Sequence, residues 1–371
     1  MAGRLKGKKI LFITPHRPGR SPSQRFRFEE YLDYFKEKGY NYTLSFLIKE
    51  TEDKLFYSKG KEIQKFFLFV KFFLKRCFDV VRSFRYDIVF IQREMYFIGP
   101  PIFEWLLRFS RAKMIFDFDD SIWLQNVSDA NKKYQWLKSF GKTAKIISYA
   151  DMVFAGNNYL KEYASEYSKN IKIVPTTIDT TEYTPVEDKH RIGAINIGWS
   201  GSFTTIQHFK YAEGFLKKLA EKYPGKISIT VIGDSHYQNK TLPVRAYDWN
   251  KDEELEKLAS FDIGIMPLPD DNWAKGKCGL KGLQYMALGI PTLMSPVGVN
   301  TEIIQDGENG YLAGNDEEWI EKISLLIESP DLRKKIGAAG RQTVEERYSF
   351  NAWKDKYVSY FEELIAEKNH S

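Results

Sequence analysis

The chain has 371 residues, which at about 150 residues per domain predicts two to three domains. It is 43% hydrophobic and 28% charged, a balance that excludes intrinsic disorder, collagen and low-complexity fibres. A net charge of +6 suits phosphate-bearing ligands or an anionic membrane surface and argues against a duplex nucleic-acid binder. The two cysteines exclude a disulfide framework and a four-thiolate zinc site, so a reduced, cytoplasmic compartment is expected. No apolar run reaches the roughly 18 residues that suggest a membrane span.

In chain order, the first half alternates apolar strands with helices. The first predicted strand, 9–13, is followed by a polar loop, 14–23, and a helix over 24–38. Further strands are predicted at 42–47, 87–92, 113–118, 152–155 and 171–174. Because these strands are apolar throughout rather than alternating, we expect a parallel sheet covered on both faces.

The same pattern then starts again. Strands are predicted at 195–199, 227–232, 262–266 and 291–294, with a helix over 206–223. The fold class is therefore α/β, with two Rossmann-like doubly wound domains facing each other across a cleft. We expect an N-terminal domain over 1–186, a second domain over 187–350, and a last helix within 351–371 that crosses back to the first domain. Ligands should bind at the carboxyl ends of the strands.

The clearest chemical signal lies in a glycine-containing loop that runs into a helix. A helix that begins near Gly279 offers free backbone N–H groups and a positive dipole end to an anion. Lys277 and Lys281, four residues apart, can reach the same anion. The alternative is a solvated basic helix end without a ligand.

The stretch 277–292 resembles the donor loop of retaining glycosyltransferase family 4, which has the GT-B fold. In that family the loop has the sequence Phe-Gly-Leu, followed by Ala-Met-Ala-x-Gly-x-Pro. This chain has Cys-Gly-Leu at 278–280 and Tyr-Met-Ala-Leu-Gly-Ile-Pro at 285–291. The two glutamates of the family's Glu-x7-Glu motif fall on Gly276 and Gln284, so the usual carboxylates are absent. Three further stretches carry the resemblance: 174–185, 197–202 and 262–268.

The resemblance implies a nucleotide-sugar donor, UDP- or GDP-linked, held by the second domain. It implies no cofactor and no metal, because lysines and backbone N–H groups would stabilise the departing diphosphate. Lys281 is expected to contribute to catalysis as well as to binding. For Glu302 the alternative is a charge at a helix N-terminus. The implied donor-binding residues are Ser200, Gly201, Ser202, Gly233, Trp249, Lys277, Gly279, Leu280, Lys281, Gln284 and Glu302.

In the first domain, Asp119 and Asp120 follow a strand at its carboxyl end. By resemblance one of them approaches the reacting sugar. The alternatives are a cap for the next helix and the metal motif of the GT-A fold, which the second α/β half contradicts. His16, Arg25 and Arg27 are candidates for an acceptor or for the donor diphosphate; otherwise they are a loop histidine and helix-surface arginines.

The aromatic excess is concentrated at 61–85, which carries a net charge of +5. Apolar residues follow helical spacing there and exceed what one core contact needs. A basic, Phe-rich amphipathic helix suits an anionic bilayer surface, and we expect Phe69, Phe72 and Lys75 to face it. The alternative is a core helix with a solvated basic face.

Taken together, the sequence predicts a retaining, hexosyltransferase-like enzyme that needs no metal. It would move a sugar from a nucleotide-sugar to a glycan or lipid-linked glycan in cell-surface polysaccharide or glycoconjugate synthesis. Its expected place is the cytoplasm, peripherally on the inner face of the membrane. Two alternatives stay open: a GT-B-fold sugar epimerase or phosphorylase, and a catalytically silent GT-B scaffold subunit.

Overall fold

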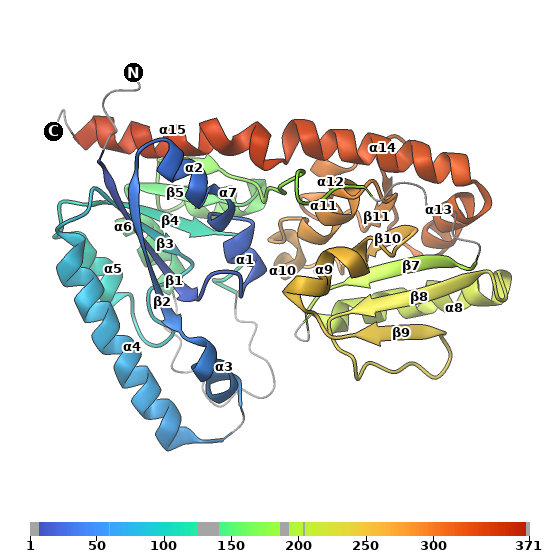
Figure 1. Cartoon of the computed structure of the whole chain (residues 1–371), viewed down its shortest axis with the longest axis horizontal. Coiled ribbons are helices and arrows are strands. Elements are labelled where there is room, and N and C mark those ends of the chain that lie inside the picture. Colours follow the sequence, from blue (N-terminus) through green and yellow to red (C-terminus); the bar gives the residue numbers. More distant parts are fainter. Residues whose placement is uncertain (1–6, 59, 125–140, 186–192, 203–204, 369–371) are drawn as a thin grey trace. The chain divides into compact units, whose positions relative to one another are not determined.

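A computed structural model describes residues 7–58, 60–124, 141–185, 193–202 and 205–368. The chain forms two compact units (Figure 1). The first unit contains Met1–Pro175 and Lys354–Ser371, and the second contains Thr176–Trp353. The boundary expected between 186 and 187 lies outside the described residues. Among the described residues, no helix is both long enough and apolar enough to span a bilayer.

The first unit is built on six parallel strands in the order β2-β1-β3-β4-β5-β6. Ile10 to Ile13 of β1 are fully buried, as expected for a strand covered on both faces. The register pairs Phe12 with Leu44 of β2 and with Phe90 of β3. The strands are β1 (Lys9–His16), β2 (Asn41–Ile48), β3 (Ile88–Gln92), β4 (Lys113–Phe118), β5 (Met152–Ala155) and β6 (Ile171–Ile173).

Helices cover both faces of this sheet. One layer holds α3 (Glu50–Tyr57), α4 (Glu62–Ser83), α5 (Ile102–Leu107) and α6 (Lys142–Tyr149); the other holds α1 (Pro22–Arg25), α2 (Leu32–Glu37), α7 (Asn158–Ser165) and much of α15 (Phe350–Lys368). The single helix expected over 24–38 is wrong. The chain leaves α1 at Phe26, passes Phe28 at φ −146°, and turns through a 3-10 helix, Glu29–Tyr31, into α2.

The second unit repeats the plan with six parallel strands in the order β12-β11-β10-β7-β8-β9. Counted within the unit, this is the doubly wound order 3-2-1-4-5-6 read from the other edge. The strands are β7 (Ile195–Ser200), β8 (Ile227–Ile232), β9 (Val244–Tyr247), β10 (Ile263–Met266), β11 (Thr292–Met294) and β12 (Tyr311–Leu312).

On one face of the second sheet, Phe215 of α8 stacks on Trp319 of α13 with ring centroids 4.7 Å apart. On the other face, α11 packs on β10 and β11, with α14 behind it. The two Rossmann-like domains expected from the sequence are confirmed. The helical elements of this unit are a 3-10 helix (Ile206–Ala212), α8 (Glu213–Lys222), α9 (Lys251–Leu258), α10 (Asn272–Lys275), α11 (Leu280–Ala287), α12 (Asn300–Ile303), α13 (Asp316–Glu328) and α14 (Pro330–Arg347).

Two segments pack where sequence order alone does not place them. Residues 176–185 belong to the second unit, since the Ile178 N–H donates to the Tyr348 carbonyl and Tyr183 is buried there. In α15, Tyr357 and Phe361 are buried in the first unit among aromatic rings from five other elements. Phe361 lies 4.7 Å from Phe35 and 6.1 Å from Phe90, ring centroid to centroid. Part of the aromatic excess is therefore core packing.

Candidate functional site

In the second unit, the strand order reverses between β7 and β10, so the loops that follow these strands lie at the position where open α/β sheets bind ligands. Ser200 ends β7, and its N–H and hydroxyl both bond the buried Tyr285 hydroxyl, at 2.7 and 2.9 Å. Burial raises the pKa of Tyr285, so this hydroxyl stays protonated. Tyr285 thus fixes the end of β7, a role that the sequence did not reveal.

Glycine is required where the ends of β7 and β8 meet. A Cβ on Gly201 would lie 2.3 Å from the Trp199 ring, and one on Gly233, at φ +144°, would lie 3.1 Å from the Gly201 carbonyl carbon. Ser202 is exposed and its N–H donates to the Thr205 hydroxyl at 2.9 Å. Three of the predicted donor-binding residues therefore form one narrow, glycine-lined strand end.

Of the two predicted lysines, Lys281 lies beside this strand end and Lys277 lies beside α10. The Lys281 ammonium lies 5.0 Å from the centroid of the Trp199 ring, and the Lys277 ammonium lies 5.1 Å from that of Trp273. Burial and then the charges of Lys281 and Lys277 lower the pKa of His208 to about 4. His208, which sequence reasoning missed, is therefore neutral at pH 7, and it senses both lysine charges.

The start of α11 is held by a close approach of α12. Gly279 precedes α11 at φ +70°, and a Cβ there would lie 2.4 Å from Ile303. Leu280 is the first residue of α11. On α12, Asn300 is buried and donates to the Ser295 carbonyl at 3.0 Å. Glu302, a predicted donor-binding residue, is exposed on the same short helix.

Among the residues that the structure describes, three buried polar atoms in this region have no hydrogen-bond partner: Trp199 Nε1, His208 Nδ1 and Asn300 Oδ1. Trp199 and Asn300 are each 1% exposed and His208 is 6% exposed. Buried polar groups are ordinarily satisfied, and an unsatisfied one costs about 1–3 kcal/mol. These three atoms lie near the loop that carries the lysines, and a polar ligand bound there could satisfy them.

Trp249 and Gln284, both predicted to bind the donor, meet through a residue that was not predicted. The buried Glu254 carboxylate accepts from Trp249 Nε1 at 2.8 Å, from the Tyr183 hydroxyl at 3.2 Å and from Gln284 Nε2 at 3.3 Å. Gln284 Nε2 also donates to the Tyr183 hydroxyl at 3.0 Å. Gln284 is 3% exposed, so its amide nitrogen is engaged in a buried network. No motif spacing in the sequence points to Glu254.

In the first unit, the two predicted carboxylates are organised by an arginine from the loop after β3. Arg93 binds Asp119 through Nε at 2.9 Å and Nη2 at 2.8 Å, and its Nη2 lies 3.8 Å from Asp120. Burial lowers the pKa of Arg93, but the carboxylates of Asp119 and Asp120 outweigh it and raise the pKa overall. Arg93 adopts φ +63°, an unfavourable backbone for a residue with a Cβ. Such strain marks Arg93 as a functional candidate that the sequence missed.

The structure corrects the expectation for Arg27. Its side chain is fully buried and ion-paired with Asp117, at the end of β4, and it also donates to the Val174 carbonyl. Burial raises the pKa of Asp117 to about 6, against the opposing charge of Arg27. A buried carboxylate needs such a partner, so Arg27 is used inside the fold. Arg25 is 9% exposed, with its guanidinium 4.8 Å from the Phe26 ring centroid.

His16 ends β1 and lies beside the loop that carries Arg93. Burial and then the charge of Arg20 lower the pKa of His16 to about 4, so the ring is neutral. The Gln24 side chain bonds both the His16 N–H and the His16 carbonyl at 2.9 Å. Within the described part of the chain, the buried His16 Nδ1 has no hydrogen-bond partner, whereas Nε2 lies 3.4 Å from the Tyr57 hydroxyl.

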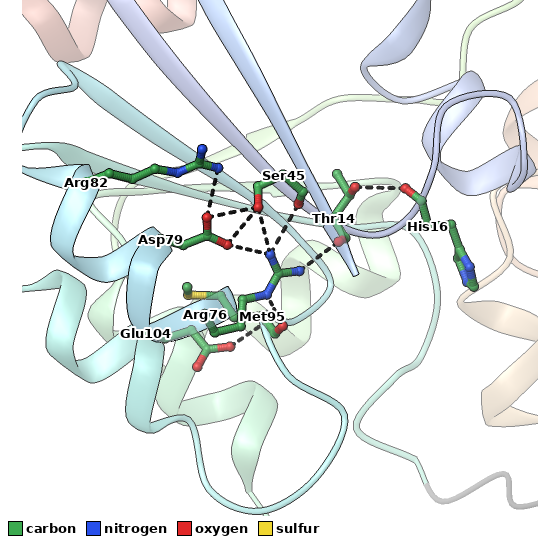
Figure 2. A network of polar contacts seen from close by, with 8 residues as sticks. All are labelled: Thr14, His16, Ser45, Arg76, Asp79, Arg82, Met95 and Glu104. Carbon is green, nitrogen blue, oxygen red and sulfur yellow. Dashed lines mark hydrogen bonds and ion pairs between the residues drawn. The ribbon is translucent and has the colours of Figure 1, made fainter. Parts of the chain in front are cut away.

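A buried ion network fastens α4 to strands β1 and β2 and to the loop after β3 (Figure 2). Arg76, fully buried on α4, donates to the carbonyls of Thr14 at 2.7 Å, Ser45 at 3.2 Å and Met95 at 2.5 Å. Asp79 balances its charge at 2.7 Å. One guanidinium thus connects β1, β2 and the loop after β3.

Over the residues that the structure describes, one group of three could hold a metal ion. Asp234, His236 and Asp248 bring their ligand atoms within 4.8 Å of one another, at a partly exposed edge near β8 and β9. Both oxygens of the Asp248 carboxylate accept hydrogen bonds from Ser235, one from its N–H and one from its hydroxyl, each at 2.9 Å. These bonds lower the pKa of Asp248.

Comparison with known proteins identifies the second unit. Residues 194–329 match the family described as Glycosyl transferases group 1. The second unit is a group 1 glycosyltransferase domain. An uncharacterized glycosyltransferase of Methanocaldococcus jannaschii is 25% identical over 284 residues, covering 70% of each chain. Two other curated relatives are matched over only 22% and 35% of their own lengths.

Solved structures extend the likeness to both units. A glycosyltransferase from Rickettsia africae superposes with a TM-score of 0.66 at 17% identity, covering 97% of this chain and 99% of that one. HepE of Anabaena, solved with UDP-glucose, gives a TM-score of 0.63 at 13% identity, covering 96% and 99%. The GT-B fold expected from the sequence is confirmed, with the glycosyltransferase domain as its second half.

Proposed function

We propose that the protein is a retaining glycosyltransferase that moves a hexose from a nucleotide-sugar to a glycan or lipid-linked glycan acceptor. The observation that carries this proposal is the pair of lysines at the start of α11 in the group 1 domain. Lys281 lies beside the glycine-lined end of β7, Lys277 lies just before α11, and both charges act on His208. A UDP- or GDP-linked sugar is the proposed donor, and HepE of Anabaena, which shares the fold, was solved with UDP-glucose.

The chemistry follows from what these groups can supply. As the bond between sugar and diphosphate breaks, negative charge grows on the leaving oxygen. The two ammonium groups and the N–H groups at the start of α11 would stabilise that charge without a metal ion. The leaving diphosphate would help to deprotonate the acceptor on the same face of the sugar, so the anomeric configuration is kept.

The first unit is proposed to hold the acceptor side. Two nitrogens of Arg93 bind Asp119 Oδ1 at 2.8 and 2.9 Å, which holds this carboxylate beside the end of β4. His16, neutral at the neighbouring strand end, can exchange a hydrogen bond with a sugar hydroxyl. Asp119 and His16 therefore orient the acceptor, whereas Arg27 does not take part.

The test is donor turnover with and without acceptor. Purified protein is incubated with UDP-glucose, UDP-N-acetylglucosamine or GDP-mannose, with or without lipid and glycan extracts, in EDTA. Release of nucleoside diphosphate only with acceptor, and an α-linked product by NMR, are expected. Release or isomerisation without acceptor would indicate the epimerase alternative, and no turnover with any donor would indicate the scaffold alternative.

We further propose peripheral binding to anionic membranes through α4. The outer face of this helix is apolar, whereas its inner face carries Phe72, Arg76 and Asp79. The sequence-based expectation that Phe72 faces lipid is wrong, because Phe72 is fully buried; Phe69 is half-buried. The exposed apolar residues of this face, together called the α4 face, are Ile63, Phe66, Phe67, Val70, Phe73, Leu74, Phe78, Val81 and Phe84.

Exposed apolar patches of this kind mark interaction surfaces, and the surrounding lysines and arginines favour an anionic one. Replacement of Leu74, Phe78 and Phe84 by Ser should release the protein from vesicles that contain phosphatidylglycerol, with UDP binding unchanged. Wild-type protein that does not co-sediment with these vesicles at low salt would contradict the proposal.

A further inference from the structure

The α4 face is not uniform, because part of it borders a hollow of about 300 Å³ in the first unit. Four residues of α4 and two residues of the loop after β3 surround the hollow. All six side chains are apolar or aromatic, and the Tyr96 ring contacts the rings of Phe69 and Phe73 edge to face. The lining residues are Phe66, Phe69, Val70, Phe73, Tyr96 and Ile98.

The far wall of the hollow is held firmly in place. The Tyr96 hydroxyl donates to the Phe69 carbonyl at 3.1 Å, and Lys142 bonds the Tyr96 carbonyl. One residue earlier, the Met95 carbonyl accepts from Arg76 at 2.5 Å and the Met95 N–H donates to Glu104 at 2.8 Å (Figure 2). Both backbone groups of Met95 are thus hydrogen-bonded to buried ionisable side chains. The hollow is preformed, which reduces the entropy cost of filling it.

The same loop carries the acceptor-side arginine. Arg93 lies three residues before Tyr96, a stretch of backbone that spans at most about 10 Å. Arg93 binds Asp119, and Tyr96 lines the hollow. A ligand with a polar head at Arg93 and a hydrocarbon tail in the hollow would therefore touch one continuous loop.

We propose that this hollow binds the hydrocarbon chain of a lipid-linked, anionic acceptor. The proposal rests on the glycosyl transfer proposed above and names the acceptor class as a lipid phosphate rather than a free glycan. Charge favours that occupant, because the segment 61–85 has a net charge of +5. A second copy of the chain would bring the same positive charge against it, so a dimer through this helix is disfavoured.

Alkyl phosphates of increasing length test the hollow without any transfer assay. Octyl and decyl phosphate, kept below their micelle concentrations, are titrated calorimetrically into the full chain. Each methylene that becomes buried should raise affinity about fourfold, so decyl phosphate should bind about 16-fold more tightly than octyl phosphate. The ratio of the two affinities cancels the contribution of the phosphate, which both ligands share.

Two matched pairs of variants locate the hydrocarbon chain of the bound alkyl phosphate. Val70→Asp and Val81→Asp make the same change on the same helix, but only Val70 lines the hollow. Phe66→Ser and Phe67→Ser change neighbouring residues that are 64% and 65% exposed, of which only Phe66 lines it. We expect the 16-fold ratio to persist in Val81→Asp and Phe67→Ser and to fall below fourfold in Val70→Asp and Phe66→Ser.

The opposite results overturn the proposal. An unchanged ratio in both Val70→Asp and Phe66→Ser, or no chain-length dependence in wild type, would show that the hollow does not hold the chain. A concentration-dependent dimer that only these two variants abolish would assign the hollow to a second copy. UDP binding is measured on every variant: its absence throughout would contradict the proposed transfer while leaving the alkyl phosphate result to decide the hollow.

Discussion

Replacement of Lys281 by Ala tests the donor site most directly. The change removes the ammonium that lies 5.0 Å from the Trp199 ring centroid, and it leaves the start of α11 with its backbone N–H groups. A hydrogen bond to a charged group contributes about 1.5–3 kcal/mol, so UDP should bind about 10- to 100-fold more weakly. The matched control is Lys218→Ala on α8, whose ammonium pairs with Asp316 at 3.2 Å.

A second measurement on the same variants does not depend on the ligand. Because the Lys281 charge helps to hold the pKa of His208 near 4, Lys281→Ala should raise that pKa towards the ordinary histidine value. Conversely, UDP bound to the wild type should raise the pKa of His208, since its diphosphate offsets the lysine charges.

Isothermal titration calorimetry gives the UDP affinity, and NMR titration of the histidine ring protons gives the pKa, with His208→Gln to assign the signal. The reasoning would be refuted by a Lys281→Ala protein that binds UDP as wild type does. It would equally fail if Lys218→Ala lost as much affinity, because general charge rather than a local contact would then account for the effect.

Three further predictions concern catalysis, the buried ion pair and pH. Asp119→Asn should lower transfer at least tenfold, measured by product formation, with the urea midpoint of unfolding nearly unchanged; a large loss of stability instead would make Asp119 structural. Arg27→Met should lower the free energy of unfolding by about 3–5 kcal/mol in urea denaturation, because it leaves Asp117 buried without its counter-charge; a change below 1 kcal/mol would contradict the pairing. Since the pKa of His208 is near 4 when folded and about 6.5 when unfolded, the unfolded chain binds more protons in that interval. Stability should therefore fall as pH drops from 6.5 to 4, by up to about 1.4 kcal/mol per pH unit; the His208→Gln protein should show a flatter pH dependence, and an identical one would disprove it.

Strands β1 to β8, β10 and β11 were predictable because their apolar runs are a local signal, whereas β9 and the two-residue β12 were not predicted. The same holds for Lys277, just before α11, and Lys281, in its first turn, because each stands next to a glycine in the sequence itself. Arg25 and Arg27 show the limit: they flank Phe26 symmetrically in the sequence. Only the break in the helix at Phe28 turns the Arg27 side chain towards Asp117, 90 residues away.

Helix α4 shows a second limit. Its most apolar face is exposed, so helical periodicity, which ordinarily assigns the apolar face to the core, does not identify the buried face. The buried face is fixed by Arg76 and Asp79, whose partners are backbone carbonyls of β1 and β2 and the Ser45 hydroxyl. Arg93 and Glu254 were missed for the same reason. The sequence around a single charged residue does not indicate which distant groups it binds.

The aromatic packing of α15 bears on how the protein is made. Tyr357 and Phe361 complete a core whose other rings, such as Phe12 and Phe90, are synthesised far earlier. A ribosome that adds about 5–20 residues per second needs roughly 10–40 seconds to pass from residue 175 to the last helix. During that time the nascent first half lacks its last two rings, whereas residues 176–353 are contiguous in sequence. We therefore expect the second half to reach its native state first, and the first half to rely on chaperones until translation is nearly complete.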